Sequence, residues 1–190
     1  MKDLKFYNKK AYELRKALFE KFYLLNEGHP GSVFSILDVL IVLYYNKHVR
    51  FSGKKAIDDI IMSKGHATTG QYPILRDLKI LRERDWVNWG KNQNSILKMF
   101  GNHKIPGIKT ATGSLGHGIG FGTGIAYAAQ NAKKNKRVFV IISEGELYEG
   151  STWESLILLA HLNIKNVFII LDVNNNIILG KTKDCLDLGN

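Results

Sequence analysis

Two short, uninterrupted apolar segments constrain the fold of this 190-residue chain more than any other feature of its sequence. Residues 138–142 and residues 167–171 consist entirely of apolar residues. Runs of this length without polar alternation are typical of strands that are covered on both faces. The residues between them leave room for one helical crossover, the usual connection between neighbouring parallel strands. The sequence therefore predicts the α/β class, with a doubly wound, mostly parallel sheet and helices on both faces.

The remaining elements fit around these two strands. Residues 59–62 predict a third short, buried strand, and residues 101–113 are rich in turn formers and predict an irregular segment. Ser35 can cap the second predicted helix, and Ser151 with Glu154 predicts a capping box for the last one. We expect residues 1–190 to form a single domain. Helices are predicted over residues 4–25, 36–45, 67–81, 82–100, 116–133 and 151–162.

The composition limits the classes of function. The net charge is +10, but the lysines and arginines are scattered and no basic helix is interleaved with aromatics, so we expect no nucleic-acid partner. No apolar run approaches the ~20 residues of a membrane span, and no apolar segment follows the charged N-terminus as it would in a signal peptide. We therefore expect no membrane partner. The single cysteine, Cys185, cannot form an internal disulfide, which fits the reducing cytoplasm.

Polar residues follow both apolar segments. Glu144 comes just after the first and Asn174 just after the second, 30 residues apart. Ligands of such folds bind at the carboxyl ends of the strands, and carboxylate and amide oxygens are ligands that Mg²⁺ and Ca²⁺ prefer. The pair therefore predicts a site for one of these ions, completed by a backbone carbonyl. Asparagine is also common in turns, so each motif alone fits an ordinary polar loop as well.

Two further sets of residues point to the same end of the sheet. The glycine-rich segment 112–120 leads into a helix, where backbone N–H groups can approach a phosphate, although tight helix packing explains these glycines equally well. His29, His66 and His103 all lie in glycine-containing turns. A single histidine is more often structural, but three in such turns favour a polar cleft that handles hydroxyl groups and protons.

Five motifs occur in the order in which the N-terminal half of transketolases carries them. From about residue 10 to its end, the sequence resembles this thiamine-diphosphate-binding half. The resemblance implies the thiamine diphosphate-binding fold, thiamine diphosphate as cofactor and a bound Mg²⁺ or Ca²⁺. The motifs are Gly-His-Pro-Gly at 28–31, Ser-Lys-Gly-His-Ala at 63–67, Thr-Gly-Ser-Leu-Gly at 112–116, Gly-Glu-Leu-Tyr-Glu-Gly at 145–150, and residues 172–180.

The resemblance also implies roles for individual residues. The implied metal ligands are Glu144, Asn174 and the backbone carbonyl of Asn176. Three histidines are implied to act on the donor sugar and at the reacting centre, and Glu149 is implied to be a buried glutamate at the subunit interface, near the pyrimidine of the cofactor. The implied catalytic residues are thus His29, His66, His103 and Glu149, and the implied cofactor contacts are His66, Gly113, Ser114, Leu115, Gly145 and Asn174.

Three departures from the family pattern bear on these roles. Glu144 stands where the family has an aspartate, so the geometry at the metal must adjust to one more methylene. The loop around His103 is shorter than usual and lacks the proline that follows the histidine. The sequence stops at Asn190, where transketolases continue with further strands and a second domain. We therefore expect a partner subunit that supplies the glutamate activating the pyrimidine, and self-association through the Glu149 region.

The implied activity is the transfer of a two-carbon ketol unit from a ketose donor to an aldehyde acceptor, by one subunit of a split enzyme. Two alternatives stay open on the sequence. The first is a two-subunit 2-keto acid decarboxylase or acyloin-forming enzyme, and the second is a non-catalytic regulatory subunit. The set of three histidines favours a hydroxylated sugar substrate over a keto acid.

Overall fold

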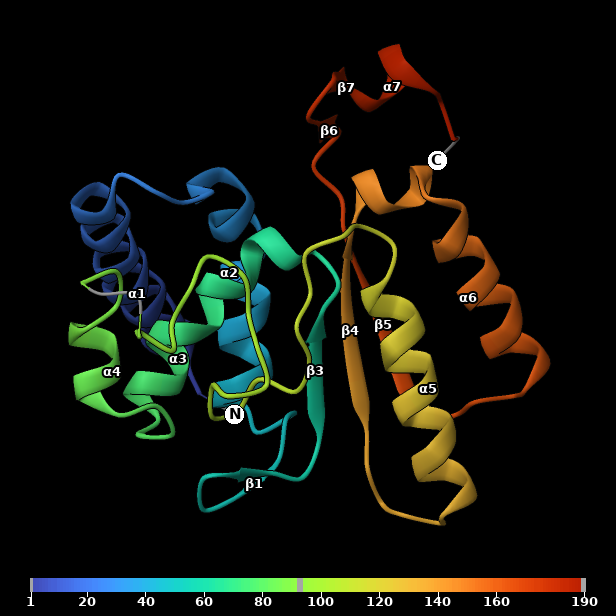
Figure 1. Cartoon of the computed structure of the whole chain (residues 1–190), viewed down its shortest axis with the longest axis horizontal. Helices are drawn as coiled ribbons and strands as arrows, with labels where there is room; N and C mark the ends of the chain where they lie inside the picture. Colours follow the sequence, from blue (N-terminus) through green and yellow to red (C-terminus); the bar gives the residue numbers. More distant parts are fainter. Residues whose placement is uncertain (1, 92–93, 189–190) are drawn as a thin grey trace.

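Three parallel strands form the centre of the fold (Figure 1). The computed structural model describes residues 2–91 and 94–188. The strands are β3 (Asp59–Met62), β4 (Val138–Ser143) and β5 (Val167–Asp172), and they are arranged in the order β3-β4-β5. Both neighbouring pairs are parallel. All three strands lie where the sequence predicts them, and their carboxyl ends meet at one edge of the sheet.

Helices cover both faces of this sheet. α1 (Leu4–Leu25), α2 (Pro30–Tyr45) and α3 (Gln71–Asp77) lie on one face, and α5 (Gly118–Asn131) and α6 (Gly150–His161) lie on the other (Figure 1). Alternate residues of the strands point to opposite faces, as the pleat requires. Ile60, Met62, Phe139 and Ile141 pack with the first group of helices, and Ile61, Val138, Val140 and Ile142 pack on the side of α5 and α6. The predicted α/β class is confirmed.

Short elements connect these layers. The hairpin of β1 (Phe51–Ser52) and β2 (Lys55–Ala56) precedes β3, and the hairpin of β6 (Asn176–Ile177) and β7 (Gly180–Lys181) follows β5. The remaining short helices are η1 (Gly65–Gly70), α4 (Glu83–Val87), η2 (Glu144–Tyr148) and α7 (Thr182–Cys185). Residues 101–113 contain neither helix nor strand, as predicted. In the described part of the chain, no helix combines the length and apolar character needed to cross a membrane.

The second helix begins earlier than predicted. α2 starts at Pro30, directly after His29, so the prediction that Ser35 caps it was wrong. Proline suits this first helical position because its fixed φ matches the helix and its missing N–H would have no partner there. Ser35 lies one turn inside the helix and donates a hydrogen bond to Asp172 instead.

The helix predicted over residues 67–81 is broken into two pieces. The 3₁₀ helix η1 precedes α3, and α3 ends at Asp77 because Lys79 adopts a left-handed conformation with φ of 57°. Pro73 lies in the first turn of α3, where its missing N–H costs no hydrogen bond.

The region 82–100 holds less helix than predicted. Over its described residues the only helix is α4, and the left-handed Gly90, with φ of 77°, turns the chain away soon afterwards. Trp86 and Trp89 lie on one side, as predicted, and both are buried with their ring centroids 5.5 Å apart.

The capping box is present, but not where it was predicted. α6 begins at Gly150 and has no side-chain cap, and Ser151 donates its hydroxyl hydrogen to the Gly116 carbonyl oxygen at 3.1 Å. The capping box lies at the start of η2 instead, between Ser143 and Glu146. Glu146 is therefore drawn inside the protein, which has consequences for the site.

The strand β5 is less buried than predicted. β4 is buried along its whole length, but β5 lies at one side of the described sheet and Phe168 is 46% exposed. The Phe168 ring stacks on the Phe139 ring of β4, with centroids 5.0 Å apart. The apolar run predicts the strand correctly but does not reveal how well it is covered.

Candidate functional site

The predicted site residues gather in the loops at the carboxyl ends of the three strands. Ser63 and His66 follow β3, Glu144 follows β4 and Asn174 follows β5. The segment that leads into α5 crosses above these strand ends (Figure 1). It touches the first loop, because a Cβ atom on Gly65 would lie 2.7 Å from the backbone nitrogen of Gly113. Glycine at 65 therefore allows the two backbones to meet.

Glu144 and the asparagine loop converge as the sequence predicts. One oxygen of the Glu144 carboxylate, Oε2, accepts hydrogen bonds from the backbone N–H groups of Asn174 and Asn175, both at 2.6 Å. Asn176 donates its backbone N–H to the Asn174 side-chain oxygen at 3.1 Å, which closes a turn within the loop. Neighbouring strand ends thus bring together residues that lie 30 positions apart in the sequence.

The oxygen atoms at this position fit a hard divalent cation. The second oxygen of Glu144, Oε1, has no hydrogen-bond partner among the described residues, so it is available to a ligand. The amide oxygen of Asn174 and the backbone carbonyl of Asn176 belong to the same loop. Within residues 2–91 and 94–188, no group of three His, Cys, Asp or Glu side chains is placed to hold a metal. A cation here would therefore depend on one carboxylate, neutral oxygens and the oxygens of a bound phosphate.

A buried carboxylate that sequence reasoning missed connects the loops. Glu146 is completely buried and accepts a hydrogen bond from the Ser63 hydroxyl. It also accepts the backbone N–H of Gly116 at 3.0 Å and that of Ser143 at 2.8 Å. Ser63 in turn accepts the backbone N–H of Ile119, in the first turn of α5. One side chain thus joins the end of β3, the end of β4 and the start of α5.

Two of the three predicted histidines lie together. The His29 and His66 rings are edge-to-face, with centroids 5.7 Å apart. His103 is exposed and, among the described residues, makes no ring contact with either of them. Gly101 nevertheless packs against Thr68 of η1, so the loop that carries His103 lies beside the helix that carries His66. The structure confirms the proximity of the first pair and leaves the role of His103 a prediction.

The surroundings of His66 keep its imidazole neutral. Partial burial is the largest cause, and the charge of Lys64 and the neighbouring His29 add to it, lowering the pKa of His66 to about 4. Asp172 acts in the opposite direction but does not offset them. A neutral imidazole can accept a hydrogen bond at one nitrogen and donate one at the other, as recognition of a hydroxyl group requires.

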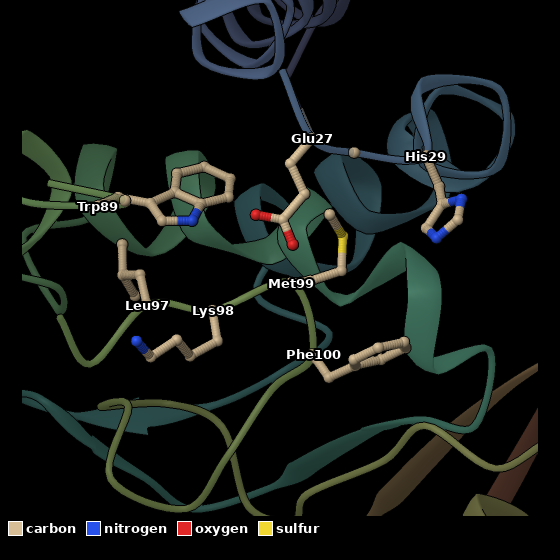
Figure 2. Close-up of a pocket in the computed structure, with 9 residues that line it drawn as sticks. Glu27, His29, Trp89, Leu97, Lys98, Met99 and Phe100 are labelled. Carbon is tan, nitrogen blue, oxygen red and sulfur yellow. The ribbon is translucent and has the colours of Figure 1, made fainter. Parts of the chain in front are cut away.

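A groove opens beside His29. Its volume is about 830 Å³, and Trp89 and Phe100 supply aromatic walls. Figure 2 shows the Glu27 carboxylate directed into the groove between Trp89 and Met99, with His29 on the side away from Trp89. Aromatic faces with a few charged groups are a composition that suits hydroxylated ligands.

The other predicted cofactor residues border the same edge. Gly113 and Ser114 are exposed, Leu115 is half-buried, and Gly145 opens η2 beside Glu144. Glu149 is exposed in this chain, and its side chain packs against Gly116 of the same loop.

This arrangement agrees with the comparison against known families, in which residues 9–188 match the thiamine diphosphate binding domain of transketolase. The chain belongs to the transketolase family. The match covers every site residue described above, and the transketolase fold accounts for their meeting at one edge of the sheet.

Individual transketolase relatives support this assignment. The chain is 35% identical to a subunit of the apulose-4-phosphate transketolase of Actinobacillus succinogenes over 90% of its own length, and 33% identical to the corresponding protein of Phocaeicola vulgatus over 92%. It spans only 65% and 63% of these two relatives. It is also 30% identical to human transketolase over 86% of the chain, which is 27% of the human protein.

Solved transketolase structures share the fold. The crystal structure of Campylobacter jejuni transketolase matches 98% of this chain with a TM-score of 0.85 and 26% sequence identity, and the match covers 31% of that protein. Transketolase from Leishmania mexicana matches 95% of the chain with a TM-score of 0.82 and 25% identity.

Replacing Glu146 with glutamine should loosen this end of the transketolase domain. The amide nitrogen would face the N–H and O–H donors that the carboxylate now accepts, so we expect Glu146→Gln to lower the free energy of unfolding by roughly 1–3 kcal/mol. Glu154 is exposed on α6, and Glu154→Gln should change it by less than ~0.5 kcal/mol. Urea denaturation of both variants provides the comparison, and equal effects would remove Glu146 from its connecting role.

The neutral state of His66 predicts a specific pH dependence. Its pKa in the folded chain is about 4, against an ordinary value of 6.5. Between these pH values the unfolded chain takes up a proton that the folded chain refuses, so stability falls as the pH drops from 6.5 towards 4. The free energy of unfolding of the wild type should therefore fall more steeply over this range than that of His66→Gln. Parallel slopes for the two proteins would contradict the assignment.

Proposed function

We propose that this chain is the cofactor-binding subunit of a split, transketolase-like transferase. The enzyme moves a two-carbon ketol unit from a ketose donor to an aldehyde acceptor. The observation that carries the proposal is the convergence of Glu144 with the asparagine loop at adjacent strand ends, on the same edge of the sheet as the His29–His66 pair. Family membership adds the cofactor class to this geometry.

The loops at the strand ends hold the diphosphate and its metal. Bound thiamine diphosphate supplies a nucleophilic thiazolium carbon and an electron sink for breaking a carbon–carbon bond. Glu144, Asn174 and the carbonyl of Asn176 hold Mg²⁺ or Ca²⁺ against the diphosphate. The backbone of residues 113–115 and that of Gly145 contact the cofactor, and the start of α5 contributes N–H groups and a favourable helix dipole.

The histidines orient the sugar. His66 is neutral, so it can both accept and donate hydrogen bonds to donor hydroxyls without introducing a charge. His29 lies beside it at the end of the groove, and the groove accommodates the rest of the sugar chain. His103 is assigned to the same substrate from its position in the family motif. This set of hydroxyl-binding groups favours a ketose over a 2-keto acid, and the relatives that match carry transketolase names.

A partner chain completes the enzyme. Two relatives are named as one subunit of an apulose-4-phosphate transketolase, which supports a two-subunit arrangement in which the partner contributes the glutamate that activates the pyrimidine. Self-association through the Glu149 region is supported by the exposed apolar side chains of the adjoining helix α6. Trp153, Ile157 and Leu158 are 47%, 70% and 49% exposed. Cys185, unpaired and exposed, suits the cytoplasm as the proposed location.

The metal role of Glu144 gives the first test of the proposal. Glu144→Ala should abolish the metal-dependent binding of thiamine diphosphate, because the only carboxylate at the diphosphate is lost. Glu144→Asp should retain binding, since it restores the family residue. Calorimetric titration with and without Mg²⁺ measures both variants against wild type. Alanine and wild type binding the cofactor equally tightly would show that the metal lies elsewhere.

Assembly gives the second test. We expect this chain alone to show no carbon–carbon bond transfer and to self-associate, whereas a mixture with its partner transfers a ketol unit to an aldehyde. Size-exclusion chromatography with light scattering, run beside a transfer assay, measures both properties. A monodisperse monomer that is active alone would refute the split arrangement. A mixture that binds thiamine diphosphate without any turnover on ketoses or 2-keto acids would point to the regulatory alternative.

A further inference from the structure

A buried ion pair crosses the site edge of the sheet. The ammonium group of Lys64 donates a hydrogen bond to Asp172 Oδ2, and their side chains are only 3% and 8% exposed. Lys64 follows β3 and Asp172 ends β5, with β4 between them. Neighbouring strands lie roughly 4.8 Å apart, so the lysine side chain spans the end of β4. Glu144 leaves β4 at this point.

A third element joins the pair. The Ser35 hydroxyl lies 2.7 Å from Oδ1 and 2.6 Å from Oδ2 of Asp172. Ser35 belongs to α2, the helix that begins directly after His29. The ion pair therefore touches three elements, and each leads within a few residues to a site residue. Lys64 precedes His66 by two positions, Asp172 precedes Asn174 by two, and α2 carries His29 at its start.

Burial makes this pair sensitive to change. Two charges removed from water are tolerated only when each satisfies the other, so loss of either partner leaves an uncompensated buried charge. A second Lys–Asp pair, Lys136 with Asp59, joins the opposite edge of the sheet at 2.7 Å. It has the same chemistry but lies away from every site residue, which makes it a matched reference for effects on stability alone.

The charge of Lys64 also acts on His66. Burial is the largest influence that lowers the pKa of His66, followed by Lys64 and His29, while Asp172 raises it. These are the charged and titratable groups that face the imidazole from the ends of β3 and β5 and from the start of α2.

We propose that Lys64 is a positioning residue, whose ion pair with Asp172 fixes the His66 loop and the Asn174 loop relative to each other across the strand that carries Glu144. The geometry stands by itself, whereas the consequence for turnover rests on the proposed function. Lys64 touches neither substrate nor cofactor in this account. It acts through the two loops that do.

The test compares Lys64→Met, Asp172→Asn and the control Lys136→Met in the full chain within its native assembly. Thiamine diphosphate affinity in the presence of Mg²⁺ should fall roughly 10- to 100-fold in the first two variants, as for other residues that orient ligands from behind, and less than about twofold in the control. Histidine NMR should show the pKa of His66 rising from about 4 towards 6.5 in Lys64→Met. In Asp172→Asn it should stay at or below its wild-type value, because the group that raises it is gone.

A folded Lys64→Met protein that matches Lys136→Met in both measurements would overturn the proposal. If Lys64→Met does not fold, Ser35→Ala replaces it, since Ser35 is exposed and its hydroxyl supports Asp172. A fewfold loss of affinity is then expected, and an unchanged affinity overturns the proposal. If the wild-type assembly transfers no ketol unit, the proposed function fails, yet the pKa of His66 still decides the role of Lys64.

Discussion

A completely buried carboxylate organises the functional end of this protein. Glu146 accepts hydrogen bonds from Ser63, Gly116 and Ser143, which belong to three segments that reach the site from different directions. A carboxylate is tolerated inside a protein only while its oxygens are hydrogen-bonded. The segments therefore cannot separate without exposing an unsatisfied charge. This constraint keeps the β3 loop, the β4 loop and the start of α5 in contact.

The two edges of the sheet use buried charge differently. At the amino edge, Asp58 is fully buried between Arg50 and Arg137, whose hydrogen bonds outweigh burial and hold the pKa of its carboxyl far below the usual range. These side chains lie away from the predicted site residues and stabilise the start of β3 and β4. At the carboxyl edge, the pair of Lys64 and Asp172 and the carboxylate of Glu146 lie directly behind the site loops. There the same chemistry fixes ligand-binding groups in place.

The sequence predicts the parts of this structure that depend on local pattern. Residues 138–142 are predicted to form a buried strand because an unbroken apolar run leaves few other choices, and parallel pairing with the next strand brings Glu144 to Asn174. The start of α2 was misplaced because Ser35 has the character of a cap, whereas its hydroxyl is used by Asp172 far along the chain. The roles of Lys64, Asp172 and Glu146 could not be predicted. Lys64 and Asp172 are 108 positions apart, and charged residues give no sign of burial until a partner is placed beside them.

The location of the metal tests the central claim most directly. Crystals of the protein grown with thiamine diphosphate and Mn²⁺, measured near the manganese absorption edge, would show the ion as an anomalous peak. The account predicts one peak within direct ligand distance, about 2.0–2.6 Å, of the Glu144 carboxylate and the Asn174 side-chain oxygen, with diphosphate density beside residues 113–115. A peak at another position, or cofactor density away from the carboxyl ends of β4 and β5, would contradict it.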